Sequence, residues 1–536
     1  MFTEKMLESI KKVEATRAER MKTEPRRMTA EEKDELLKAY HPDYREEGFG
    51  EIKTGPNKGE KAPKELCELL SSNSRILGED IDLSKVDYDV DVLVIGGGGA
   101  GSSAAIEANE AGANVMIVTK LRIGDANTMM AEGGIQAADK PNDSPVQHYI
   151  DAFGGGHFAA RPELLRRLVM EAPDAIKWLS DLGVMFDKEE DGTMVTTHGG
   201  GTSRKRMHAC KDYSGAEIMR NLRDEVLNRK IPVVDFTAAI EIIKDTEGKA
   251  AGAVLLNMET DEILVARAKT VIIATGGAGR MHYQGFPTSN HYGATADGLV
   301  LAYRAGAPLL YQDTLQYHPT GVAFPSQIYG ALVTEKVRSM GAMFVNREGE
   351  VFMHPLETRD VAASGIIREC KERGNGVPTP VADGIWLDTP MIDMIHGEGT
   401  LEKRLPGMLR MYLRCGIDMR KVPIVIYPTL HYQNGGIKVG VNGMSDVENL
   451  YVAGEAIGGI HGRNRLMGNS LLDIIVFGRN AGQQAGAKCK EVELKELTLS
   501  HVDDFSKMLS DAGIEPTVVS PKLLPDYRPE GVNRLN

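Results

Sequence analysis

The stretch Asp91–Ala105, DVLVIGGGGAGSSAA, decides the fold of this chain. The apolar run before the glycines predicts a buried strand, the small residues after them predict a helix, and NVMIVTK further on predicts a second strand. Gly96, Gly98 and Gly101 form GxGxxG directly between strand and helix. The first glycine permits a tight turn, the second lets a pyrophosphate approach the backbone, and the third lets helix and strand pack closely. The pattern therefore predicts a Rossmann-like βαβ unit that binds a dinucleotide at the helix N-terminus.

The bulk composition excludes several classes of protein. At 536 residues the chain suits about two to four domains, and 42% hydrophobic with 26% charged residues is typical of a soluble globular protein. A net charge of -13 argues against a nucleic-acid partner. The five cysteines lack CxxC spacing, so we predict no metal site and no disulfide framework. Because no apolar run reaches about 18 residues and the N-terminus is unlike a secretory signal, we expect a cytoplasmic protein without direct membrane insertion.

Shifts of pattern along the chain predict four parts. Residues 1–88 form a charged, partly helical N-terminal arm, which we expect to be solvated or, alternatively, to dock another subunit. Residues 89–313 and 430–490 form the predicted dinucleotide-binding domain, and residues 314–429 are expected as an insertion with its own helices and strands. Residues 491–536 form a short, weakly patterned tail.

The ends of the later strands favour a flavin over a nicotinamide cofactor. The second predicted strand ends in IVTK, at Lys120, where an NAD site usually carries an acidic residue for the ribose. Two further apolar strands end in glycines, VIIATGGAGR and YVAGEAIGG, where the chain could close around a cofactor a second time. In the second of these, Glu455 is a candidate for ribose hydroxyls.

Histidines and arginines gather beside glycines and prolines within the insertion and at its borders. The set is His318, Glu335, Arg338, Arg359, Asp360, His431 and Arg465. Each alone could be a surface ion pair or a structural histidine, but loop-like strand ends are where sites are commonly built. Arginine grips a carboxylate through two parallel hydrogen bonds, so convergence of these donors would suit a small dicarboxylate.

Taken in order, the motifs resemble a known family. DVLVIGGGGAG, AEGG, ATGGAGR, QYHPTG, TExxR, TRD, PTLHY, VAGEA and HGRNRLMGNSLLD are similar to those of the flavoprotein subunits of succinate dehydrogenases and fumarate reductases, which include L-aspartate oxidase. The resemblance implies an α/β fold with a Rossmann-like FAD-binding domain interrupted by an α+β capping domain, and an active site at their junction. The tail is too short for the C-terminal helical domain of the respiratory members.

The resemblance also implies a role for individual residues. Arg359 would protonate the substrate while flavin N5 delivers hydride to fumarate, and Glu335 and Arg338 would relay protons from solvent. His318, Thr334, His431 and Arg465 would bind the substrate carboxylates. The implied FAD contacts are Gly96, Gly98, Gly101, Lys120, Asn127, Gly133, Gly134, Thr275, Gly276, Glu455, Ser470 and Leu471.

Asn127, in GDANTMMAEGG (124–134), occupies the position of a histidine that binds the flavin covalently in respiratory members. An amide cannot form that bond, so we predict non-covalent FAD. A covalent bond generally raises the flavin potential and helps succinate oxidation, so its absence favours fumarate reduction.

Three alternatives remain open from the sequence. L-aspartate oxidase shares most of these residues, although His198 stands where that enzyme is expected to place a glutamate for the substrate amine. Departures from the family pattern at Lys336, Ser339, Asn434 and Arg463 leave room for a reductase of another unsaturated carboxylate. The chain could also be an electron-transfer subunit with a vestigial substrate site. Since it contains no cluster or haem motif, we expect electrons from an iron–sulfur or other electron-transfer subunit, or from a small donor.

Overall fold

The computed structural model describes residues 2–525; Met1 and residues 526–536, the end of the predicted tail, lie outside the described residues. Its largest sheet has eight strands in the order β20-β10-β11-β12-β4-β5-β9, with β19 also paired to β12. The bounds are β4 Tyr88–Ile95, β5 Val115–Val118, β9 Val233–Val234, β10 Thr237–Asp245, β11 Ala250–Asn257, β12 Ile263–Ile273, β19 Leu450–Val452 and β20 Leu497–Thr498. Strands β9, β5, β4, β12 and β19 run parallel, whereas β11, β10 and β20 extend the sheet antiparallel.

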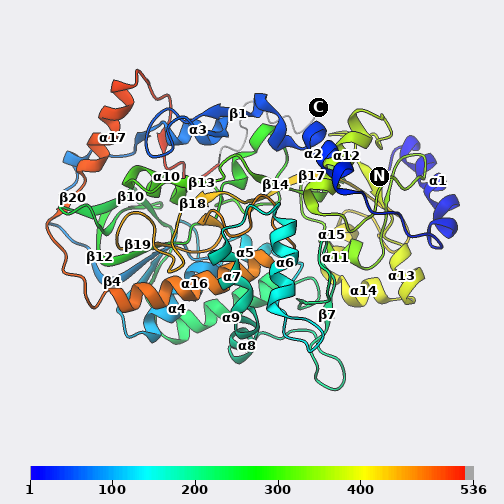
Figure 1. Cartoon of the computed structure of the whole chain (residues 1–536), viewed down its shortest axis with the longest axis horizontal. Helices are drawn as coiled ribbons and strands as arrows, with labels where there is room; N and C mark the ends of the chain where they lie inside the picture. The colour runs from blue at the N-terminus through cyan, green and yellow to red at the C-terminus, as the bar shows by residue number, and fades with distance from the viewer. Residues whose placement is uncertain (1, 526–536) are drawn as a thin grey trace.

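The predicted βαβ unit is confirmed, with α4 (Gly99–Glu110) between β4 and β5. The long helix α16 (Asn469–Lys488) packs against α4, and both lie below the large sheet in Figure 1. Glycines four residues apart let the two helices approach closely. A Cβ at Gly482 would lie 2.2 Å from the Ala104 carbonyl oxygen, and one at Gly478 would lie 2.7 Å from that of Ala100. The fold around the glycine motif is therefore fixed by backbone contact as well as by apolar burial.

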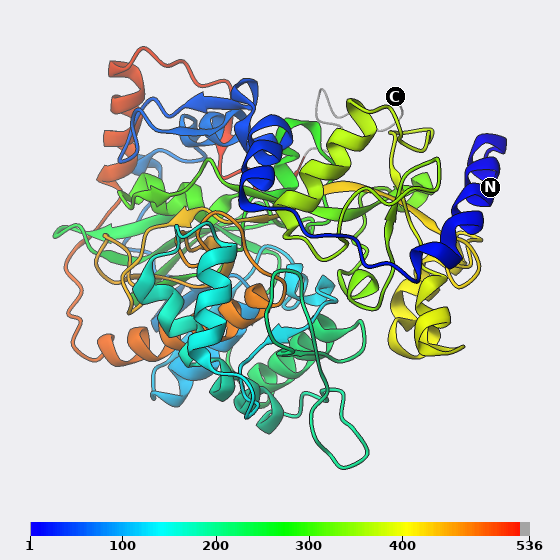
Figure 2. The same ribbon diagram turned by 45° about the vertical axis from the view of Figure 1, so that its right-hand side comes forward.

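A second, antiparallel sheet forms the cap, in the order β14-β17-β16-β15. Its strands are β14 Leu315–Phe324, β15 Phe344–Val345, β16 Ile385–Leu387 and β17 Ile424–Gln433, and its helices are α11 Lys336–Ser339, α12 Arg359–Lys371, α13 Met391–His396, α14 Thr400–Arg404 and α15 Pro406–Arg414. These elements enclose an apolar core of their own around Trp386 and Phe344. Figure 2 shows the cap beside the large sheet, so the molecule has two packed halves.

The first two helices belong to the core of the cap, and the expectation of a solvated arm is wrong. Helix α1 (Glu4–Arg20) buries Met6, Ile10 and Val13 against the cap, and α2 (Ala30–Tyr40) packs on α12. Ser9 Oγ accepts a 2.7 Å bond from Trp386 Nε1. Figures 1 and 2 both show α1 against the cap helices. The frequent charges of the arm concealed an apolar stripe at helical spacing. Not all of these charges face solvent, since Arg17 and the buried Arg20 pair with the buried Asp388 of the cap.

The described tail also packs onto the body of the protein. Helix α17 (Ser500–Asp511) and β21 (Val519–Ser520) follow the last strand of the large sheet. Strand β21 pairs in parallel with β3 (Asn73–Ser74), so segments near the two ends of the chain meet beside α3 (Lys64–Leu70; Figure 1). Among residues 2–525, no helix is both long and apolar enough to cross a membrane.

We expect Met6→Ala to destabilise the protein by about 2–5 kcal/mol, because it leaves a cavity where a fully buried side chain packs on the cap. The matched control is Leu7→Ala on the same helix, whose side chain is 47% exposed and whose loss should change stability by less than about 0.5 kcal/mol. Urea unfolding followed by tryptophan fluorescence measures both. Equal effects of the two substitutions would contradict the packing of α1.

Candidate functional site

A deep cleft opens where the parallel strands β4, β5 and β12 end. Its lining comes from residues 95–100, 118–121, 125–128 and 274–276, with Glu455 from the turn after β19. Crevices at the carboxyl ends of parallel strands are where α/β folds bind dinucleotides. The cleft continues past Asn127 and Glu455 into a smaller pocket lined by Ser470, Leu471 and His431. The two pockets share Asn127, Thr128, Glu455 and Ile474 as lining residues, so they are neighbours between the glycine motif and the cap.

The glycine motif forms the turn that the sequence predicts. Gly98 is the N-cap of α4 and lines the cleft, which aims the positive end of the helix dipole into it. Gly96 has a φ of +119°, a backbone angle that residues with a side chain rarely adopt. A Cβ at Gly101 would lie 1.9 Å from the Gly96 carbonyl oxygen, so only glycine fits there. Thr128, which sequence reasoning missed, accepts a 3.1 Å bond from Gly99 N. This arrangement suits a pyrophosphate.

The other proposed cofactor residues fall into two groups. Lys120, Asn127, Thr275, Gly276 and Glu455 line the cleft, and Ser470 and Leu471 line its extension. The buried Thr275 Oγ1 has no hydrogen-bond partner among the described residues and packs against Gly298. In contrast, Gly133 packs closely on Met467 and Gly134 on the His208 carbonyl. The donor set along the cleft fits a dinucleotide, and Thr275, Lys120 and the glycine turn would hold it.

Asn127 begins the short helix α5 (Asn127–Met130) and makes three hydrogen bonds. Its Oδ1 accepts from His291 N at 2.5 Å, and its Nδ2 donates to Asn290 Oδ1 at 2.8 Å and to Glu455 Oε2 at 3.3 Å. Burial raises the pKa of Glu455 to about 7, although hydrogen bonds from Gln433 N and Asn127 act in the opposite direction and lower it. The sequence suggested ribose hydroxyls for Glu455; the structure places it beside Asn127, where the cleft meets its extension.

The cap contributes two buried histidines from neighbouring strands. His318 on β14 and His431 on β17 have ring centroids 5.0 Å apart. Burial, then the nearby Arg359, lowers both pKa values well below 6.5, so both rings are neutral at neutral pH. Thr320 N donates to His318 Nδ1 at 3.3 Å, which leaves the ring proton on Nε2. Neutral imidazoles of this kind donate hydrogen bonds without adding charge.

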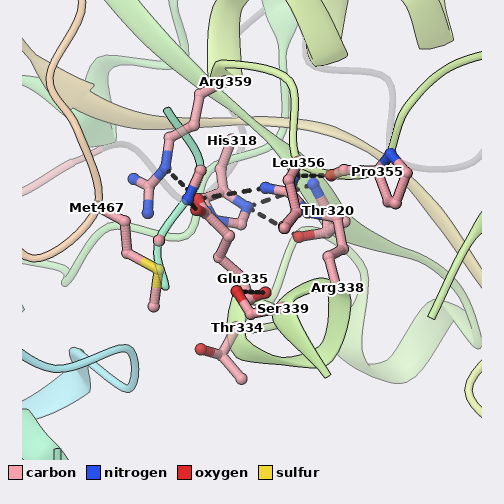
Figure 3. A network of polar contacts seen from close by, with 12 residues as sticks. His318, Thr320, Thr334, Glu335, Arg338, Ser339, Pro355, Leu356, Arg359 and Met467 are labelled. Atoms are coloured by element: carbon pink, nitrogen blue, oxygen red, sulfur yellow. Dashed lines mark hydrogen bonds and ion pairs between the residues drawn. The ribbon is translucent and has the colours of Figure 1, made fainter. Parts of the chain in front are cut away.

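Arg359, Glu335 and Arg338 form one buried chain of charges (Figure 3). Arg359 is the first residue of α12, where the helix dipole disfavours a cation, and its Nε donates to Glu335 Oε2 at 2.8 Å. The same oxygen lies 3.2 Å from Arg338 Nη2, and Arg338 Nη1 donates to the Pro355 carbonyl at 2.5 Å. The structure thus brings together the three residues to which the sequence assigned proton transfer.

The charge state of Glu335 follows from its neighbours. Burial alone would raise the pKa of this carboxyl, but Arg359, Arg338 and a 2.5 Å bond from Gly200 N together lower it to about 2. Gly200 belongs to the loop between β7 (Thr196–Thr197) and β8 (Met207–His208), outside the cap. Burial lowers the pKa of Arg338 to about 10, so the guanidinium stays protonated at neutral pH.

Gln316, in QYHPTG, is a site residue that sequence reasoning missed. Its Oε1 accepts from Arg359 Nη1 at 2.9 Å and from Arg465 Nη2 at 2.8 Å, which holds the two guanidinium groups side by side. Arg465 stacks on the Tyr432 ring, and its buried Nε has no protein partner. Burial, with repulsion from Arg359, lowers the pKa of Arg465 to about 9. The position of Gln316 two residues before His318 on β14 was the available signal.

Thr334 and Asp360 are next to the charge chain in sequence, but their side chains contact other residues. Thr334 is buried next to Glu335, and its hydroxyl accepts from Lys336 N at 3.4 Å. Asp360, beside Arg359, is buried and lies 2.6 Å from Nε2 of His157, which follows α6 (Pro145–Gly155) in the other half of the molecule. The His157–Asp360 pair therefore ties the cap to the cofactor half next to the catalytic candidate.

Comparison with known proteins identifies the family. The FAD binding domain model matches residues 91–471. The chain is 36% identical over 449 residues to a subunit of fumarate reductase (CoM/CoB) from Methanothermobacter marburgensis, covering 81% of this chain and 80% of that one. The chain belongs to the flavoprotein family of fumarate reductases, succinate dehydrogenases and L-aspartate oxidases.

One further sequence relative and one solved structure support this assignment. L-aspartate oxidase of Streptomyces coelicolor is 36% identical over 400 residues, covering 72% of this chain and 67% of that one. The structure of E. coli quinol fumarate reductase superposes with a TM-score of 0.71 at 29% identity, covering 79% of this chain and 74% of that chain. The protein is therefore an FAD-dependent oxidoreductase of the fumarate reductase and succinate dehydrogenase type, with an FAD-binding domain and a capping domain.

We expect the His157–Asp360 pair of this flavoprotein to stabilise it in a pH-dependent way. The hydrogen bond to Asp360, opposed by burial, raises the pKa of His157, and Arg463 and Asp34 also face it. A raised folded pKa gives stability that is fully present below about pH 6.5 and is lost as pH rises through the folded value. The pKa of Asp360 is lowered, since its pairing with His157 outweighs burial, so its contribution is lost only on acidification.

Urea unfolding of His157→Gln and wild type across pH 5.5–9 measures this effect. The stability difference should be largest near the acidic end and shrink towards pH 9, whereas the exposed-histidine control His396→Gln should show no such trend. A difference independent of pH would contradict an ionic pair.

Proposed function

We propose that this protein interconverts fumarate and succinate and works chiefly as a fumarate reductase. The observation that carries the proposal is Arg359, held between Glu335 Oε2 and Gln316 Oε1 and facing a buried set of histidine and arginine donors. The family relation supports it, since relatives of 33–36% identity are fumarate reductase, succinate dehydrogenase and L-aspartate oxidase proteins.

Charge balance favours a substrate with two carboxylates. In the buried ion network, three guanidinium groups, Arg338, Arg359 and Arg465, and one carboxylate, Glu335, leave an excess of two positive charges. Glu455, whose pKa is raised to about 7 by burial, adds a partial negative charge near Arg465 at neutral pH. A dianion such as fumarate or succinate neutralises that excess, which lowers the cost of burying these charges. Aspartate carries an ammonium group as well, and Glu335 is already engaged by two arginines and Gly200 N. The pocket therefore favours the acid without an amine.

Each residue has a part in the proposed reaction. Arg465, with an unpaired buried Nε, and the neutral His318 and His431 would bind the substrate carboxylates and orient the double bond. Bound FAD, once reduced by the electron donor, would supply the hydride. Arg359 would protonate the neighbouring carbon; a guanidinium seldom releases its proton, so Glu335 and Arg338 would return one along the charge chain. Donors aimed at one carboxylate would favour hydride attack by stabilising the charge that develops there.

The same proposal covers the remaining site residues and the electron source. Thr334 would support the residues that bind the substrate carboxylates. The FAD contacts would be the predicted residues that line the cleft and its extension, together with Gly101, Gly133 and Gly134.

Electrons would come from a separate electron-transfer subunit, such as an iron–sulfur protein, since related chains are named as subunits. A cytoplasmic location is part of the proposal, because the five cysteines are free thiols, as in a reducing compartment.

We expect purified protein to reduce fumarate with a reduced viologen dye, and Arg359→Gln to lower kcat by about 10²–10⁴ because the proton donor is lost. The control Arg373→Gln, just beyond the end of the same helix, should keep wild-type kcat.

No fumarate reduction by protein with a full complement of FAD would overturn the proposal. Oxidation of L-aspartate without fumarate reduction would select L-aspartate oxidase, and activity confined to other unsaturated acids would select a different reductase. Intact FAD binding with no activity on any of them would leave an electron-transfer subunit.

We further propose that FAD is bound non-covalently. At the position of the histidine that carries the flavin in respiratory members stands Asn127, whose amide is occupied by Asn290, His291 N and Glu455. Acid precipitation should therefore leave the yellow flavin in the supernatant and a colourless pellet. Flavin that stays with the denatured pellet would show a covalent bond and refute this prediction.

A further inference from the structure

The tail reaches the cofactor cleft through a short segment, residues 519–525, which we call the tail clamp. It lies beyond the part of the chain matched by the family model, residues 91–471. Leu523 in this segment is 3% exposed and belongs to an apolar cluster with Ala238 and Val254 of the large sheet. Ala238 also lines the cleft. The clamp thus forms part of the packing directly behind a wall of the cofactor site.

Leu523 holds two cleft residues through its backbone. Its carbonyl accepts a 2.6 Å bond from Lys120 Nζ, and its amide donates at 3.2 Å to Asp297 Oδ1. Lys120 and Asp297 also form an ion pair with each other, and both line the cleft. Thr295 Oγ1 completes the group, 2.7 Å from Lys120 Nζ. One tail residue therefore fixes both members of a charged pair that faces the cofactor.

The clamp is itself firmly anchored. Ser520 is fully buried, and its Oγ lies 2.5 Å from Ser72 Oγ and 2.6 Å from Arg304 Nη2. Arg75 Nε donates to the Pro521 carbonyl at 2.6 Å, next to the pairing of β21 with β3. Residues 72–75 and the tail thus brace each other, and both lie outside the region that the family model matches.

Lys120 and Asp297 lie where a bound dinucleotide is expected to place its adenosine ribose. Lys120 follows β5, the second strand of the βαβ unit, whose end meets the adenosine ribose in dinucleotide-binding folds. Asp297 is the first residue of α10 (Asp297–Ala305). A free lysine and a free aspartate would each have to be ordered when the cofactor binds, and that ordering weakens affinity. The backbone contacts of Leu523 order both side chains before the cofactor binds, so this loss of affinity is avoided.

We propose that the tail clamp is a retention device for FAD: by fixing Lys120 and Asp297 it slows loss of the cofactor from the adenosine end of the cleft. Thr295 Oγ1, Asp297 Oδ2 and the Leu523 carbonyl take the three N–H donors of the Lys120 ammonium group, so Lys120 and Asp297 act on the cofactor as a fixed, charged part of the cleft wall. Leu523 is a positioning residue that acts through them. The inference rests on FAD binding by the family and not on the identity of the substrate.

Truncation of the full chain provides the first test. Apoprotein is titrated with FAD to obtain Kd, and release of FAD from the holoprotein is followed by the rise in free-flavin fluorescence. A variant ending at residue 518 should bind FAD about tenfold more weakly and release it faster, as expected for lost hydrogen bonds to charged groups. A variant ending at residue 525, which keeps the clamp, should retain the wild-type Kd. Wild-type Kd and release rate in the shorter variant would overturn the proposal.

Two substitutions separate positioning from mere structural support. Leu523 has a φ of +68°. Leu523→Pro cannot adopt that angle and loses the amide donor, whereas Leu523→Gly adopts it and keeps both backbone contacts while losing the buried side chain. Both should lower the Tm of the apoprotein, but only Leu523→Pro should raise the FAD Kd by about tenfold.

Equal loss of FAD affinity in Leu523→Pro and Leu523→Gly, in step with their loss of Tm, would show only structural support and overturn the proposal. Since the readout is FAD affinity and not turnover, failure here leaves the proposed fumarate reduction untouched. Absence of fumarate activity would likewise leave the clamp intact.

Discussion

The buried carboxylate of Glu335 is the constraint on which the rest of the site depends. Two arginines without a counter-charge would be costly to bury, and Glu335 makes their burial possible because it contacts both. It also accepts Gly200 N from a loop outside the cap. The same carboxylate thus stabilises the guanidinium groups, keeps them in line, and connects the two halves of the molecule where the chemistry is proposed to occur.

Beside this ion network, the histidines and the glutamine of the site carry no charge. His318 and His431 are kept neutral by burial and by Arg359, so they add donors without adding to the repulsion among the arginines. Gln316 joins Arg359 to Arg465 through one oxygen, where a carboxylate would cancel the attraction for substrate. The excess of positive charge among the arginines is therefore left for the anionic substrate proposed above.

Segments outside the family region complete both halves of the protein. Helix α1 closes the core of the cap with Met6, Ile10 and Val13, and the tail clamp braces Lys120 and Asp297 at the far side of the cleft. Helix α1 thus supports the cap, and the tail clamp supports a wall of the cofactor cleft.

Local sequence was enough to predict the βαβ unit and the glycine turn, and, with the family resemblance, it named most of the residues that the structure gathers in the candidate site. Gly96, Gly98 and Gly101 fall within one turn, and His318 and Arg359 stand in recognisable motifs, so each of these signals is carried by a few neighbouring residues.

Which side chains meet, in contrast, depends on the folded chain. His157 pairs with Asp360 across 203 residues, and Lys120 pairs with the Leu523 carbonyl across 403. No periodicity marks such pairings, since a hydrogen bond between distant segments depends on how whole sheets and helices pack. The prediction for α1 was wrong for the same reason, because its partner surface exists only in the folded cap.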